Sequence, residues 1–400
     1  MKKLALSIGL VLVLLVSFVA FGCAPEAKPP AEKPPAEKPP AEKPKPPAEK
    51  PKPPEVKPIK IRFSHIYSAT PDSAPHVWIE KFQELCDKEI PGRIIAEEYP
   101  ASQLYKSVPG MKAVAAGAIE ASYWVDAYCA AVLPGDEGKN AFSATAFPIW
   151  KCPEHYYEFM VTYLPEMSKK YMEPLGVSAM GMWCSYGTQY VSTKPLRKFD
   201  DLNGVKARIS PIPWLIQLIK LLGTVPMAID VAEVPGALQS GTIDAACSVT
   251  SVLLRDKWYS MAPYMTPTGV PGINAMGGWW WNLKFLNGLP DDVRANLEKI
   301  ITQTDAYVED TISLPINHNY IEIFSSDGAK PQDWSPEELA KVQEALEPFF
   351  AEYADKPGSK WTLEKAAEMG KKYTPEYIEE LAKKYRGVKF PPGFQDLAKK

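Results

Sequence analysis

Two copies of one segment decide the fold: AVAAGAIEAS at Ala113–Ser122 and ALQSGTIDAA at Ala237–Ala246. Each copy starts as a helical stretch, reaches a glycine, and continues with the alternating pattern of a half-buried strand. Gly117 and Gly241 stand at the same place in the two copies, where each helix is expected to end. A segment that occurs twice predicts two similar lobes.

The residues before each copy extend the pattern into a β-α-β-α-β unit. In the first unit Ile59, Ile61 and Phe63 alternate with polar residues, as in a strand. We expect further strands at 93–99, 118–124, 205–210, 224–229 and 242–248. We expect a helix with Trp78, Phe82 and Leu85 on one face, and further helices near 110–116, 211–222 and 231–240. Alternating strands and helices predict an α/β protein of two lobes, each a mostly parallel sheet with flanking helices. A ligand would lie between the lobes, at the carboxyl ends of the strands.

The C-terminal third is predicted to be helical. An amphipathic face follows Pro290, Ser335 begins a capping box with proline at the first helical position, and Thr374-Pro375-Glu376 opens another helix. The expected organisation is a signal peptide at 1–22, a tether at 23–58, lobe one at 59–187 and 275–315, lobe two at 188–274, and C-terminal helices with an accessory extension at 316–400.

The N-terminus is typical of an export signal. Lys2 and Lys3 precede an apolar run, Leu4–Phe21, and small residues lead to Cys23. This ending resembles the bacterial lipoprotein signal, in which the cysteine carries the lipid, although Ala20 stands where leucine is usual. The alternative is an uncleaved membrane helix, because the run is about long enough to span a bilayer. Both interpretations place residues 24–400 outside the cytoplasm, on the outer face of the cell membrane or in the periplasm.

Residues 24–58 hold 14 of the 41 prolines and repeat Pro-Pro-Ala-Glu-Lys with variations. Such a stretch cannot build a core, and its Pro-Pro pairs favour extended polyproline II. We interpret it as a spacer between the lipid and the lobes; a ligand for a proline-recognition module is the alternative.

Composition and missing motifs restrict the function. A formal net charge of −3 is unlike that of a nucleic-acid-binding protein. The sequence contains no Gly-x-Ser-x-Gly elbow, phosphate loop, Gly-x-Gly-x-x-Gly or His-Glu-x-x-His, and its four histidines are scattered. A solute-binding protein, neither an enzyme nor a holder of a cofactor or metal, is therefore the main hypothesis. The alternatives are the binding subunit of an ATP-driven importer and an exported hydrolase with dispersed carboxylates.

An ordered set of motifs from about residue 59 to about 315 carries a family resemblance. The set comprises Phe63-Ser64-His65, Trp78-x-x-x-Phe82, Tyr99-Pro-Ala-Ser-Gln-Leu104, Val114-Ala-Ala-Gly-Ala-Ile-Glu120, Lys194-Pro195, Asp200-Asp-Leu-Asn-Gly-Val-Lys-Ala-Arg208, Gly223-Thr-Val-Pro226 and Glu233-Val-Pro-Gly-Ala-Leu-Gln-Ser-Gly-Thr-Ile-Asp244. It resembles the dicarboxylate-binding (DctP-type) substrate-binding subunits of tripartite ATP-independent periplasmic (TRAP) transporters. The resemblance implies a type II-like periplasmic-binding-protein fold that captures an organic acid and delivers it to the small and large subunits of a membrane permease.

The resemblance also assigns a carboxylate clamp. The family's arginine on the strand of lobe two corresponds to Arg208, and a guanidinium can hold both oxygens of a carboxylate. From the pattern alone, Arg208 could equally be a surface arginine beside Lys206. Many members carry a second arginine where this chain has Gln189, which suggests a monocarboxylate or a differently oriented acid. The segment Ala246–Val249 lacks the polar residues of some members, so a bound cation is doubtful.

Aromatic residues gather at the predicted strand ends. Trp279-Trp280-Trp281 cannot all face one core from a strand, so at least one should face the cleft or solvent. An aromatic or branched organic acid is the resulting hypothesis, although any single aromatic residue is more often part of the core. Besides Arg208 and Gln189, the candidate substrate-binding residues are Tyr67, Tyr123, Trp124, Trp183, Trp214, Ser248 and Trp279.

Five cysteines remain if Cys23 carries lipid, and five cannot all pair within one chain. Free thiols would be tolerable in an anoxic habitat. Buried and inert thiols are the simpler interpretation.

Overall fold

The computed structural model describes residues 57–267, 270 and 273–386. The predicted signal peptide, the predicted lipidation site at Cys23 and nearly all of the predicted tether lie outside the described residues. No helix in the described part is long and apolar enough to cross a membrane. All described residues fall in one compact unit, Glu55–Lys400.

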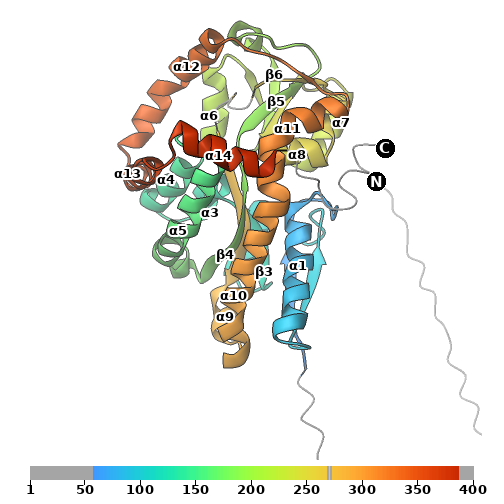
Figure 1. Ribbon diagram of the computed structural model, residues 1–400, viewed down its shortest axis with the longest axis vertical. Helices are drawn as coiled ribbons and strands as arrows, with labels where there is room; N and C mark the ends of the chain where they lie inside the picture. Colours follow the sequence, from blue (N-terminus) through green and yellow to red (C-terminus); the bar gives the residue numbers. More distant parts are fainter. Residues whose placement is uncertain (1–56, 268–269, 271–272, 387–400) are drawn as a thin grey trace, which may run out of the picture. The chain divides into compact units, whose positions relative to one another are not determined.

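The first sheet belongs to lobe one and has the strand order β2-β1-β3-β10-β4. Its strands are β1 Ile59–Ser64, β2 Ile94–Tyr99, β3 Ala121–Val125, β4 Val177–Ser185 and β10 Ala275–Asn282. Strand β1 is parallel to β2 and β3, whereas β10 is antiparallel to β3 and β4. The sheet is flanked by α1 Ala74–Glu89, α2 Ser107–Ala115, α3 Asp126–Val132, α4 Asp136–Thr145, α5 Pro153–Tyr171, α9 Leu283–Asn287 and α10 Asp291–Val308 (Figure 1).

The second sheet belongs to lobe two and has the order β11-β9-β5-β8-β6-β7. Its strands are β5 Thr188–Ser192, β6 Lys206–Ile209, β7 Val225–Ala228, β8 Ala245–Val249, β9 Tyr264–Met265 and β11 Lys330–Pro331, with helices α6 Pro213–Leu221, α7 Val234–Gln239 and α8 Thr250–Arg255. Here β6 is parallel to β7 and β8, and β5 is antiparallel to β8 and β9. Both sheets are therefore mixed, because an antiparallel strand, β10 in the first sheet and β5 in the second, pairs with the last strand of each β-α-β-α-β unit.

The repeated segment explains why the two units look alike. Gly117 and Gly241 have φ angles of 76° and 69°, a left-handed conformation that ends each helix. The N–H groups of Ala118 and Ile243 then bond back to Ala113 O and Ala237 O. Strands β3 and β8 begin later than the sequence pattern predicts because these residues complete the helix ends first.

The chain crosses between the sheets three times, from β4 to β5, from β9 to β10 and from β10 to β11. Asn274 joins the first two crossings. Its Oδ1 accepts from Gly187 N at 2.8 Å, and its Nδ2 donates to Phe147 O at 3.2 Å. Asn274 N also donates to Ala146 O at 2.9 Å.

The three consecutive tryptophans correct one expectation. Trp279, Trp280 and Trp281 are all fully buried, so none faces the cleft or solvent. The alternation along β10 puts Trp279 and Trp281 in one apolar cluster and Trp280 in another. The expectation was wrong because this sheet is covered on both faces.

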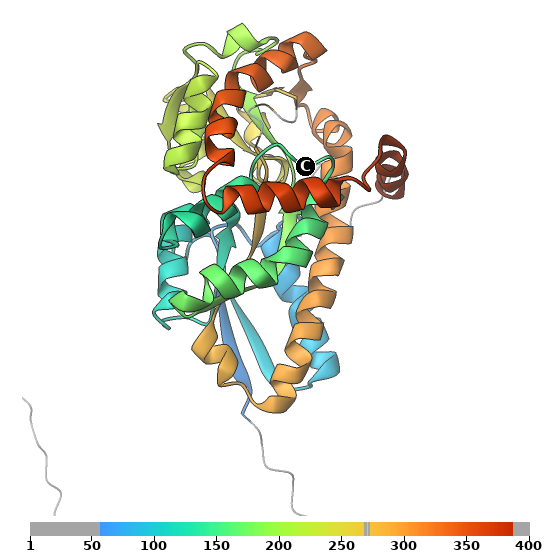
Figure 2. The same ribbon diagram turned by 90° about the vertical axis from the view of Figure 1, so that its left-hand side faces the viewer.

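The C-terminal part of the chain is helical. A π-helical turn, Glu309–Ser313, leads into α11 Leu314–Ser326, and after β11 come α12 Pro336–Ala354, α13 Ser359–Gly370 and α14 Pro375–Tyr385. Ser335 and Thr374 are N-caps, because their side chains accept hydrogen bonds from Glu338 N and Tyr377 N. The Glu338 carboxylate, the second half of the predicted capping box, accepts from Phe199 N and Lys341 Nζ instead. Figure 2 shows α12 beside lobe two and α13 beside α4 and α5 of lobe one.

Candidate functional site

A cavity lies at the junction of the two sheets and contains about 630 Å³ not occupied by protein atoms, part of it open to solvent. It is built by the carboxyl ends of β3, β6 and β8 and by the helices that follow them, as expected for an α/β protein. Its polar lining residues are Tyr67, Tyr123, Tyr128, Ser185, Thr188, Ser210, Ser248 and Asn274. Its apolar lining residues include Val125, Ala127, Ile209, Ile212, Leu215, Val249, Val252, Ile273 and Ala275. Both lobes therefore contribute to one site.

Arg208 lies on β6 beside this cavity, with 2% of its surface exposed. Its Nε donates to Ile229 O at 2.8 Å, and its Nη1 donates to Cys247 O at 3.0 Å. Cys247 and Ile209, the next residue of β6, both line the cavity. The guanidinium also lies 5.4 Å from the ring centre of Trp258. The two carbonyls fix the orientation of the side chain but bring no negative charge.

No carboxylate among the residues that the structure describes forms a salt bridge with Arg208. Burial lowers the pKa of Arg208 from its ordinary value. A guanidinium nevertheless keeps its charge in proteins, so Arg208 is a buried cation. A buried charge without a counter-ion is unfavourable, and an anion in the adjacent cavity would relieve that cost.

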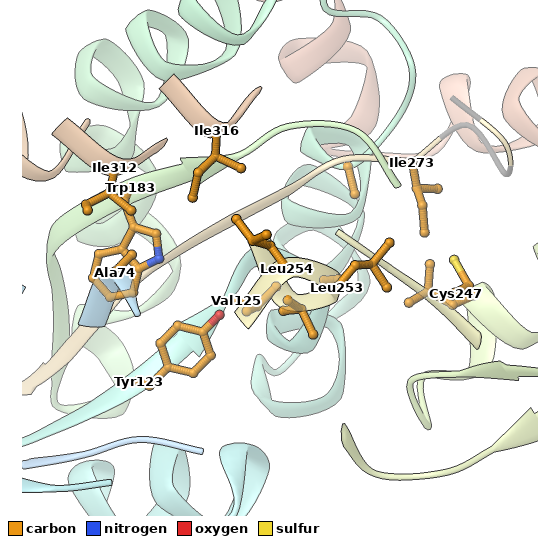
Figure 3. Packing of buried hydrophobic residues seen from close by; sticks show 14 of the residues in the cluster. Ala74, Tyr123, Val125, Trp183, Cys247, Leu253, Leu254, Ile273, Ile312 and Ile316 are labelled. Carbon is orange, nitrogen blue, oxygen red and sulfur yellow. The ribbon is translucent and has the colours of Figure 1, made fainter. Parts of the chain in front are cut away.

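Two tyrosines stand at the lobe-one side of the cavity. The hydroxyl oxygens of Tyr67 and Tyr123 lie 2.9 Å apart and share a hydrogen bond. Burial raises the pKa of both phenols, so both stay neutral. Trp183 on β4 stacks on Tyr123 with ring centres 5.8 Å apart. Figure 3 shows Trp183 and Tyr123 on one side of the junction and Cys247 and Ile273 on the other, with Leu253 and Leu254 of α8 drawn between them.

Gly277 of β10 makes this stacking possible. A Cβ at this position would lie 2.9 Å from Trp183 Nε1 and 3.0 Å from Tyr123 Cε2. A larger residue would therefore displace Tyr123, which lines the cavity, and Trp183, which packs behind it.

A second arginine whose side chain is buried, Arg255 at the end of α8, was missed by the sequence analysis. Its guanidinium lies 3.8 Å from the ring centre of Tyr67, which belongs to the other lobe. Its Nε and Nη2 donate to the carboxylate of Asp256 at 2.7 and 2.5 Å. Despite the opposing effect of burial, Asp256 raises the pKa of Arg255. The sequence Leu253-Leu254-Arg255-Asp256, an arginine following apolar residues and preceding an acid, is the signal that could have found it.

Comparison with known proteins identifies the chain. Residues 63–356 match the family model DctP, described as bacterial extracellular solute-binding protein, family 7. The chain belongs to this family. It is 28% identical over 309 residues to the C4-dicarboxylate-binding periplasmic protein DctP of Rhodobacter capsulatus, covering 76% of this chain and 89% of that protein. The family is one of transport binding proteins rather than enzymes.

Solved structures share the fold of this family 7 protein. A sugar-acid-binding protein of Advenella mimigardefordensis in complex with galactonate has a TM-score of 0.70 at 18% identity, over 79% of this chain and all of that one. A TRAP solute-binding protein of Pseudomonas aeruginosa with bound L-malate has a TM-score of 0.64 at 22% identity, over 74% and 100%. Both carry the two-lobed α/β architecture that the sequence predicts.

The remaining candidate residues of this solute-binding protein fall into two groups. Ser248, with Tyr67 and Tyr123, lines the cavity, and Trp183 packs directly behind Tyr123. Gln189 is buried on β5, where its Nε2 donates to Thr250 Oγ1 at 3.0 Å.

Three candidate tryptophans lie outside the cavity wall. Trp124 packs edge-on against Phe142 on the opposite face of β3 from Tyr123, and Trp214 packs against Phe147. Trp279 packs against the cluster around Phe63. A substrate contact for any of these remains a prediction.

All cysteines that the structure describes are free and buried: Cys86, Cys129, Cys152, Cys184 and Cys247. Burial raises the pKa of Cys86, Cys152 and Cys247 to about 12, which keeps these thiols protonated and unreactive. The interpretation as buried, inert cysteines is confirmed.

Proposed function

We propose that this protein captures an organic acid anion between its lobes outside the cytoplasm and delivers it to the small and large membrane subunits of a TRAP-type permease. Arg208 carries the proposal, because it is a buried cation that forms no salt bridge with the described residues and lies beside a cavity that both lobes line. Its guanidinium would hold the carboxylate, and the hydroxyls of Ser210, Ser248 and Tyr128 in the cavity wall could contact the ligand as well.

Closure of the lobes would follow from binding. A ligand that touches residues of both sheets gains all of its contacts only when the lobes are closed, so it shifts the equilibrium toward the closed form. The membrane subunits would then recognise the closed form. Binding, closure and recognition by the membrane subunits require no catalytic group in the cavity.

Residues 23–58 would hold the protein at the membrane. Cys23 is the proposed lipid-bearing N-terminus, and the proline-rich stretch is the spacer between the lipid and the lobes. Intact-mass analysis of the membrane-associated protein should show a lipid on Cys23 and loss of residues 1–22. A Cys23→Ser protein should leave the membrane fraction. An intact mass that still includes Met1 would contradict this anchor.

Thermal unfolding in the presence of candidate ligands tests the function. A chain beginning at residue 24 would be unfolded with a panel of organic acids, and with sugars and amino acids as controls. A ligand at 1,000 times its dissociation constant stabilises the folded state by about 4 kcal/mol, which raises the midpoint by several degrees. A shift with carboxylates that is absent in Arg208→Ala supports the proposal. A shift with sugars or amino acids and with no acid overturns it.

A further inference from the structure

One cation that lies beside the cavity, Arg208, is available for a ligand in the described part of the molecule. Arg208 has no carboxylate partner there, whereas Arg255 is held by both oxygens of Asp256. The surface cation Lys106 is paired across the lobes with Asp230 at 2.7 Å. A ligand that enters this cavity therefore finds charge compensation for one carboxylate, not for two.

Most polar groups of the cavity wall are already bonded to the protein. Tyr67 and Tyr123 bond each other, and Ser185 Oγ lies 3.1 Å from Ser251 Oγ. Thr188 Oγ1 donates to Ile273 O at 2.9 Å, and both ends of the Asn274 amide are bonded to backbone.

Ser210, Ser248 and Tyr128 are the wall hydroxyls without a bond among the described residues. A polyhydroxylated acid would need a partner for each of its hydroxyls, because an unpaired buried hydroxyl is unfavourable. These three hydroxyls, together with the one O–H that the Tyr67–Tyr123 hydrogen bond does not use, are enough for a carboxylate and one neighbouring polar group.

The rest of the wall is aliphatic and comes from both lobes. Val125 belongs to lobe one, whereas Ile209, Ile212, Leu215 and Val252 belong to lobe two. Burying apolar ligand surface here is favourable by about 25 cal/mol for each Å². Burying a second carboxylate or a row of hydroxyls against the same side chains would cost free energy.

We propose that the ligand is a monocarboxylate with a branched aliphatic or aromatic body, carrying at most one further polar group beside the carboxylate. The inference rests on the proposed function and adds the substrate class. The carboxylate binds Arg208, the neighbouring polar group reaches Ser210, Ser248 or Tyr128, and the apolar body fills the aliphatic wall.

Three acids with six carbons each separate this class from its rivals. 4-Methylpentanoate has one carboxylate and a branched body, adipate has a second carboxylate, and gluconate has hydroxyls along its chain; phenylacetate provides an aromatic member. Calorimetric titration of the wild-type protein should give 4-methylpentanoate or phenylacetate a dissociation constant about tenfold or more below those of adipate and gluconate. Tightest binding of adipate or gluconate overturns the substrate class and leaves the proposed function standing. Absence of binding by any carboxylate overturns both.

An Asp256→Asn variant tests the count of cations. The amide has the size of the carboxylate but no charge, so Arg255 becomes a second free cation beside Tyr67. The affinity for adipate relative to 4-methylpentanoate should rise about tenfold, which is the factor that 1.4 kcal/mol provides. Asp291→Asn is the matched control, because Asp291 pairs with Arg294 on an exposed helix face.

Each outcome of this experiment is informative. An unchanged ratio in Asp256→Asn overturns the argument from a single cation, as does an equal change in Asp291→Asn. The ligand titrations on the wild-type protein need no variant, so the proposal stays testable even if Asp256→Asn does not fold.

Discussion

Two arginines are buried near the same tyrosine-rich wall, and they differ in one respect. Arg255 is held by the carboxylate of its neighbour Asp256 and lies on the ring of Tyr67. Arg208 is held by two backbone carbonyls and has no carboxylate partner among the described residues. Carbonyls orient a guanidinium without neutralising it. The charge of Arg255 is therefore neutralised within the protein, whereas a salt-bridge partner for Arg208 would have to be supplied by a ligand.

Binding should show the largest difference between the two arginines. Arg208→Ala removes the only charge-assisted contact to the carboxylate, and loss of one partner of a buried, hydrogen-bonded charge pair costs about 2–5 kcal/mol. We expect the affinity for the organic acid to fall at least about 30-fold in Arg208→Ala. Arg255→Ala should weaken binding much less, because Arg255 acts through Tyr67. Calorimetric titration of both variants measures this.

Arg208→Lys provides the matched control for charge. Lysine keeps the positive charge but cannot bond Ile229 O, Cys247 O and a carboxylate with one planar group. Affinity between those of the wild type and Arg208→Ala is expected. Equal losses in the Ala variants of Arg208 and Arg255 would remove the distinction between the two side chains.

The pH dependence of binding should identify the ligand as the titrating partner. Burial lowers the pKa of Arg208, but a guanidinium stays charged over the accessible pH range. A free carboxylic acid has a pKa near 4.3, so the anion that Arg208 binds disappears below that value. Affinity should therefore be constant between about pH 6 and 9 and fall about tenfold per pH unit below the pKa of the acid. A loss of affinity between pH 7 and 9 would show that another group controls binding.

The difference between the arginines also marks the limit of sequence analysis. The repeated segment at 113–122 and 237–246 predicted the two lobes, because a helix end followed by an alternating strand is a local pattern. Arg208 could be proposed because the motif that carries its family resemblance is local as well. Arg255 was missed because its position near the cavity depends on Tyr67, which is far away in the sequence and in the other lobe.

The aromatic residues illustrate the same limit. Alternation along β3 puts Tyr123 in the cavity wall and Trp124 in a core on the opposite face. Alternation alone does not tell which face meets the cavity. Trp279–Trp281 were misjudged because the sequence does not show that helices cover both faces of β10.

In the ligand-free protein, Arg255 should matter more than Arg208 for the free energy of unfolding, which is the reverse of their order in ligand binding. Replacing an uncompensated buried charge with an apolar residue of similar length is often neutral or stabilising, whereas breaking a buried ion pair is destabilising. Arg208→Met should leave the free energy of unfolding unchanged or raise it by about 1 kcal/mol, after the loss of two hydrogen bonds. Arg255→Met should lower it by about 2–3 kcal/mol, because Asp256 loses its partner.

Urea unfolding of both variants without ligand measures this difference. An equal loss of stability in both would mean that the two carbonyls compensate Arg208 as fully as Asp256 compensates Arg255. Arg208 would then be a structural residue, and its missing salt bridge would no longer support the proposed function.

Tyr67→Phe should change ligand affinity least of all these substitutions. It tests whether Arg255 influences the cavity through the ring of Tyr67. The substitution keeps the ring under Arg255 but removes the hydroxyl that bonds Tyr123. Loss of one neutral hydrogen bond costs about 1 kcal/mol or less, so ligand affinity should fall less than about fivefold. Tyr67→Leu also removes the ring beneath Arg255 and should have a larger effect, since a desolvated cation–π contact contributes about 2 kcal/mol. If the two variants behave alike, Arg255 does not act through the ring of Tyr67, and the contact between the lobes contributes only shape to the cavity wall.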